Sequence, residues 1–78
     1  MYTDSMRKAF HSINGPQKFQ LQIIDNDNFL TVRASEKQFM SLSGEERKEA
    51  VEYMIRVKKA LEDNGAIVLL VREGGKEL

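Results

Sequence analysis

The longest apolar run of the chain comprises six consecutive hydrophobic residues, from Ala66 to Val71. Residues typical of turns enclose it, with Asn64-Gly65 before and Glu73-Gly74-Gly75 after. A strand without polar positions carries hydrophobic side chains on both of its faces. The run therefore predicts a strand that is covered on both sides, either by an N-terminal helix of the same chain or by another chain.

Two earlier segments alternate between apolar and polar residues and predict strands with one solvated face. In the first, glutamines separate Phe19, Leu21 and Ile23, and the second runs from Phe29 to Ala34. The residues between them, Asp25 to Asn28, all favour turns. This order predicts an antiparallel hairpin with a four-residue loop.

The N-terminal segment has the spacing of an amphipathic helix. Its apolar positions fall on one helical face and are Met6, Ala9, Phe10 and Ile13. Thr3 or Asp4 suits the N-cap, and Gly15-Pro16 suits the end of the helix. A helix of about three turns is marginal alone, so we expect this one to pack against the rest of the fold.

Two capping motifs predict the remaining helices. Ser35 with Gln38 three residues later predicts a short helical turn, and Ser43 with Glu46 begins a long helix. Asn64-Gly65 favours the left-handed conformation that ends helices. The apolar stripe of the long helix contains Ala50, Met54, Val57 and Leu61, and is widened by Val51 and Ile55.

These elements predict one α+β domain over residues 1–78, with the N-terminal helix within 1–15 and a flexible tail over 73–78. The element order is α-β-β-α-β with a short extra helical turn. A long helix between the second and third strands makes those two strands parallel. We expect a three-stranded sheet of order 2-1-3, packed on one long and one short helix. The predicted core contains Leu21, Ile23, Leu30, Val32, Met54, Leu61 and Val68.

Composition narrows the functional classes. A chain of 78 residues without cysteine buries only about 60 to 65% of its unfolded surface and gains no stability from disulfides, so oligomerisation becomes the common stabilising device. Twelve basic residues balance twelve acidic ones, which leaves no overall field to attract a polyanion. The sequence contains no apolar run of membrane-spanning length and no signal-peptide pattern, so a cytoplasmic protein without membrane contact is expected.

No constellation of residues predicts catalysis or a cofactor. Asp25, Asp27 and Glu36 have the carboxylate spacing of a calcium loop, but Phe29 and Leu30 occupy positions that need a ligand and a glycine. His11 is the only histidine, and no partner for it lies nearby in sequence. We therefore expect no catalytic, cofactor-binding or metal-binding residue in this chain.

The pattern favours a small non-enzymatic, cytosolic interaction or regulatory module, because exposed apolar patches on small proteins usually mark contacts. We expect its partner to be a second copy, forming a homodimer, or another protein. The candidate interface residues come from the N-terminal helix and the last strand, and are Met6, Phe10, Ile13, Ile67, Leu69 and Val71.

Two alternatives remain at this stage. The first is a domain that binds single-stranded nucleic acid on an open sheet face, using Lys18, Phe29, Arg33 and Arg72. Zero net charge argues against it. The second is an enzyme whose site is completed across a dimer interface.

Overall fold

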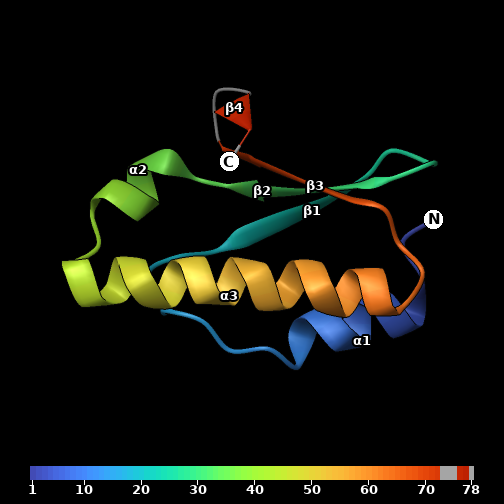
Figure 1. The fold of residues 1–78 in the computed structure, drawn as a ribbon, viewed down its shortest axis with the longest axis horizontal. Helices are drawn as coiled ribbons and strands as arrows, with labels where there is room; N and C mark the ends of the chain where they lie inside the picture. Colours follow the sequence, from blue (N-terminus) through green and yellow to red (C-terminus); the bar gives the residue numbers. More distant parts are fainter. Residues whose placement is uncertain (73–75, 78) are drawn as a thin grey trace.

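The computed structural model describes residues 1–72 and 76–77 and has the predicted α+β architecture (Figure 1). Helices and strands follow the predicted order, with one additional short strand close to the end. The elements are α1 (Asp4–His11), β1 (Leu21–Asp25), β2 (Leu30–Ala34), α2 (Glu36–Met40), α3 (Gly44–Asp63), β3 (Val68–Arg72) and β4 (Lys76–Glu77).

The sheet is mixed, and its strand order is β1-β2-β3-β4. β1 and β2 form the predicted antiparallel hairpin, β3 runs parallel to β2, and β4 pairs antiparallel with β3. The predicted order 2-1-3 is wrong, because α3 returns the chain to the free edge of β2, where the Leu30 N–H donates to the Ile67 carbonyl at 2.8 Å. As a result β2 is central, and Leu30 and Val32 are fully buried.

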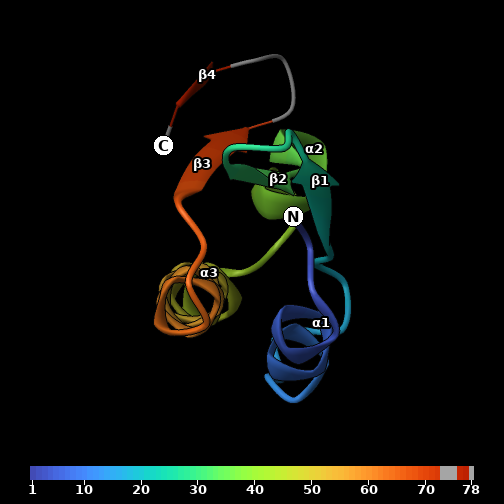
Figure 2. The ribbon, with the colours of Figure 1, turned by 90° about the vertical axis from the view of Figure 1, so that its right-hand side faces the viewer.

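Both long helical segments lie on one side of the sheet. Figure 2 shows α1 and α3 side by side beneath the strands, with α2 at the level of the sheet. The side chains between these layers form the core, which contains Met6, Phe19, Leu21, Leu30, Val32, Ala34, Leu42, Ala50, Tyr53, Met54, Val57, Leu61 and Ala66. Of the predicted core residues, Ile23 and Val68 are only partly buried. The N-terminal helix therefore does not cover the second face of the last strand.

The helix α1 is shorter than its apolar spacing predicted. Thr3 is the N-cap and accepts a hydrogen bond from the Met6 N–H, as expected for one of the two candidates. The helix ends at His11, before Gly15-Pro16, and the Ser12 hydroxyl donates to the Ala9 carbonyl at this end. Ile13 thus lies in the following loop and not on the helix.

The helices α2 and α3 begin where the capping motifs predicted. The Ser35 hydroxyl accepts from the Gln38 N–H, while the Gln38 side chain accepts instead from the Gln20 N–H beside β1. At α3, Ser43 and Glu46 form a complete reciprocal capping box. The stripe of α3 is narrower than predicted, since Val51 and Ile55 are exposed. Tyr53, which the stripe did not include, is buried instead.

The hairpin loop has the predicted length of four residues but lies one residue later than predicted, because Asp25 still pairs with Leu30 as the last residue of β1 and Phe29 belongs to the loop. The Asn26 N–H donates to the Phe29 carbonyl, and Asp27 adopts a positive φ of 69°, which aspartate tolerates better than most residues. Of the expected tail over 73–78, Lys76–Glu77 form β4, and the other positions lie outside the described residues.

Candidate interaction surfaces

The face of the sheet opposite the helices, here called the open face, carries the outward side chains of three strands. Alternation along β2 leaves Leu30, Val32 and Ala34 buried and places Thr31 and Arg33 on the open face. The register then sets neighbours across the sheet. Ile24, Thr31 and Leu69 form one row, and Gln22, Arg33 and Val71 form the next.

One half of the open face is apolar. Ile67 is 69% exposed and Leu69 is 37% exposed. Extending the β2 and β3 register by one residue places Phe29 beside Ile67. We call Ile24, Phe29, Ile67, Leu69 and Val71 the open-face patch. The other half is polar and contains a shallow hollow between β1, β2 and α2 that is lined by Gln20, Gln22, Arg33, Ala34, Ser35 and Gln38.

The six predicted interface residues fall on opposite sides of the sheet. Ile67, Leu69 and Val71 belong to the open-face patch. Met6 is 2% exposed, and Phe10 and Ile13 pack against the core. The N-terminal apolar residues therefore serve the interior of the domain, and the structure does not join them with the last strand into one surface.

The four nucleic-acid candidates are also dispersed. Lys18 precedes β1 and lies at the Ala34 end of the hairpin, whereas Phe29 lies at its opposite end. Arg33 is exposed on the open face. Arg72 belongs to the helix side of the sheet, where its Nη1 lies 3.4 Å from a Glu36 carboxylate oxygen. These side chains do not form one aromatic and basic platform.

Among the titratable groups considered in the sequence, Asp25 has a structural role. The Asp25 carboxylate accepts hydrogen bonds from the N-terminal ammonium group and from the Tyr2 and Asp27 N–H groups. These bonds, the one from the ammonium group first, lower the pKa of Asp25 to about 2. His11 is exposed, with its ring edge-on to Phe10. Within residues 1–72 and 76–77, no three acidic, histidine or cysteine side chains gather as metal ligands would.

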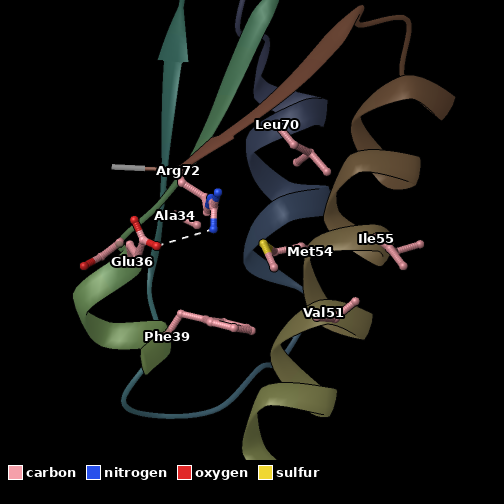
Figure 3. A pocket seen from close by; sticks show the side chains of 9 residues that line it. Ala34, Glu36, Phe39, Val51, Met54, Ile55, Leu70 and Arg72 are labelled. Carbon is pink, nitrogen blue, oxygen red and sulfur yellow. Dashed lines mark hydrogen bonds and ion pairs between the residues drawn. The ribbon is translucent and has the colours of Figure 1, made fainter. Parts of the chain in front are cut away.

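Sequence reasoning did not find an apolar pocket that the structure shows. A pocket of about 240 Å³ lies between α2, α3 and the end of β3, and Figure 3 shows its side chains. Its lining comprises Ala34, Ser35, Glu36, Phe39, Val51, Met54, Ile55, Leu70 and Arg72. The available signal was the excess width of the α3 stripe, because Val51 and Ile55 widen this stripe in the sequence and line the pocket in the structure.

Comparison with known proteins adds no relative from which a role could be transferred. No protein-family model, curated protein or solved structure matches the chain. Among the helices of the described residues, none has both the length and the apolar composition needed to cross a membrane. Function is therefore inferred from the two apolar surfaces, the open-face patch and the pocket.

Proposed function

We propose that the protein is a small non-enzymatic interaction module that self-associates through its open-face patch. The exposure of Ile67 and Leu69 supports this proposal, because both are large aliphatic side chains beside further apolar residues on an uncovered sheet face. Contiguous apolar surface of this kind on a small protein usually marks a contact. A cytoplasmic, regulatory role is part of the same proposal, since a fold without cysteine does not depend on an oxidising compartment.

The proposed occupant of the patch is a second copy of this chain. Zero net charge removes the long-range repulsion that keeps charged proteins apart. The patch itself contains no charged residue, and Arg33 lies beside it in the polar half. Two sheets stack face to face at a separation of about 10 Å, and a two-fold axis lets the same patch serve both subunits.

The expected dimer is weak, because only one half of a small sheet contributes apolar area. Interfaces that bury less than about 1,200 Å² in total belong to transient complexes. A dimer whose formation depends on the concentration of the protein in the cell suits a regulatory module. The subunits would separate readily when the patch is needed for another protein.

Sedimentation equilibrium tests this proposal with a matched pair of variants. Ile67→Glu places a charge in the open-face patch and should make the protein monomeric. Ile55→Glu makes the same change at a similarly exposed isoleucine, on the opposite side of the sheet, and should leave association intact. A wild-type protein that stays monomeric across the accessible concentration range, or dissociation by Ile55→Glu alone, would overturn the proposal.

A further inference from the structure

The pocket between α2, α3 and β3 has the shape and chemistry of a site for one large apolar side chain. Phe39, Met54 and Leu70 form its walls, and Val51 and Ile55 stand on the α3 side of it (Figure 3). Val51 is 42% exposed and Ile55 is 57% exposed, so apolar surface remains uncovered there. A cavity of about 150 Å³ accommodates a benzene ring, and this pocket, at about 240 Å³, is larger.

Polar groups next to these walls match a peptide backbone. Arg72 and Glu36 belong to the lining of the pocket, and their side chains are 37% and 43% exposed. Their contact of 3.4 Å is long for an ion pair, and the buried Arg72 Nε has no hydrogen-bond partner among the described residues. Arginine offers donors and glutamate offers acceptors, which are the complements of a peptide C=O and a peptide N–H.

The outer edge of β3 supplies further backbone groups beside the pocket. Because the Ile67 carbonyl accepts from Leu30 of β2, alternation directs the N–H and C=O groups of Val68 and Leu70 to the opposite, outer side. Among the described residues, β4 pairs with this edge at Val71 and Arg72. Within residues 1–72 and 76–77, no strand therefore pairs with Val68 or Leu70 on that side.

We infer that the β3 edge and the pocket together bind an extended peptide segment of a partner protein, one large apolar side chain of which enters the pocket. The edge already accepts a strand, since β4 pairs there. A strand added beside Leu70 lies about 4.8 Å from β3 and places alternate side chains on the helix side of the sheet, at the level of the pocket. Backbone hydrogen bonds then provide affinity, and the pocket selects the side chain.

Blocked synthetic peptides of the form acetyl-Thr-Val-Xaa-Val-Thr-amide test this inference. Calorimetry measures their affinity, and amide chemical shifts locate their binding. With leucine or phenylalanine at Xaa, the peptide should bind about tenfold or more tightly than with alanine, because a hydrophobic pocket discriminates by the methylenes it buries. The Val68 and Leu70 amides should shift and exchange more slowly with solvent.

The same matched variants separate this site from the open-face patch. Ile55→Glu should weaken the leucine peptide by about tenfold or more, whereas Ile67→Glu should bind it as the wild type does. Both isoleucines are exposed, so both variants should fold, which circular dichroism verifies. The inference is overturned if no peptide of the series binds, if leucine and alanine peptides bind equally, or if Ile67→Glu alone abolishes binding.

Discussion

Gly15 lies directly against the ring of Tyr53. A Cβ atom added at Gly15 would come within 2.5 Å of two ring carbons, which is far closer than van der Waals contact allows. The backbone of the loop between α1 and β1 thus packs on an α3 side chain that is itself buried. The glycine is required by this close approach rather than by the end of a helix.

Gly15→Ala should therefore destabilise the protein. Overpacking of this kind costs about 1 to 3 kcal/mol, which lowers the Tm of a domain this small by about 4 to 8 °C for each kcal/mol. Gly44→Ala is the control, because nothing lies within 4 Å of its added Cβ and alanine favours helices. Thermal melts of both variants measure their Tm values. If Gly15→Ala melted at the same temperature as the wild type, the close packing of Gly15 against Tyr53 would be refuted.

Leu61→Ala should be among the most damaging single changes in α3. Leu61 is fully buried between the helix and the sheet, and removing a buried leucine side chain costs about 2 to 5 kcal/mol. Ile55→Ala on the same helix removes a similar volume from an exposed position and should cost much less. Urea titration of the two variants compares their free energies of unfolding, and similar losses would show that the buried stripe is wrongly assigned.

The Asp25 carboxylate should make stability depend on pH in the acid range. Its pKa in the folded protein is about 2, below the ordinary value of 3.8. The stabilisation it provides is therefore complete above the ordinary pKa and disappears as the pH falls through about 2. Asp25→Asn should lower the Tm at neutral pH, and its difference from wild type should close as both proteins approach pH 2.

Asp27→Asn is the matched control for this pH dependence. Its carboxylate makes no hydrogen bond to any described residue, and asparagine also tolerates the positive φ at this position. We expect Asp27→Asn to keep the acid-dependent loss of stability that Asp25→Asn removes, because the Asp25 carboxylate is intact in this variant. A constant difference between Asp25→Asn and wild type from neutral to acid pH would refute the role of the ionised carboxylate.

Binding to single-stranded nucleic acid should be weak or absent at physiological salt. Balanced charges leave little counterion release to drive it, and Lys18 and Phe29 lie at opposite ends of the hairpin. Fluorescence anisotropy with labelled oligonucleotides measures this at low and physiological salt. Micromolar affinity at physiological salt that is lost in both Phe29→Ala and Arg33→Ala would favour the nucleic-acid hypothesis instead.

Local signals in the sequence were enough to place most elements. The Ser43 and Glu46 pair predicted the beginning of α3, and Asn64-Gly65 predicted its end, where Gly65 has a φ of +97°. Such signals work because the side chain bonds to backbone groups only a few residues away. The hairpin loop was predictable to within one residue for the same reason.

The order of the strands could not be read from the same signals. β3 has hydrophobic side chains that suit either free edge of the hairpin, so periodicity alone does not choose between β1 and β2. The choice depends on the crossover, in which α3 delivers Ile67 to the Leu30 N–H. Tertiary geometry of this kind is not encoded in any short segment.

The candidate surfaces were predictable only in part. The exposed residues Ile67 and Leu69 were predicted as interface residues, but Met6 has the same apolar character and is buried. The pocket escaped prediction because Val51 and Ile55 continue the core stripe of α3 in the sequence. Whether a stripe is fully covered depends on the width of the sheet above it, which no helical periodicity reveals.

The parallel pairing of β2 with β3 also bears on the order in which the chain folds. The β1–β2 hairpin closes a four-residue loop and should form within about 1 to 10 μs, and α3 also depends on local contacts. β3 must instead bring Val68 beside Leu30 across the whole of α3. Its docking is the non-local and therefore slow event. Until β3 docks, the edge of β2 that later pairs with β3 has no partner strand. During this interval, pairing of that edge with another chain competes with correct folding.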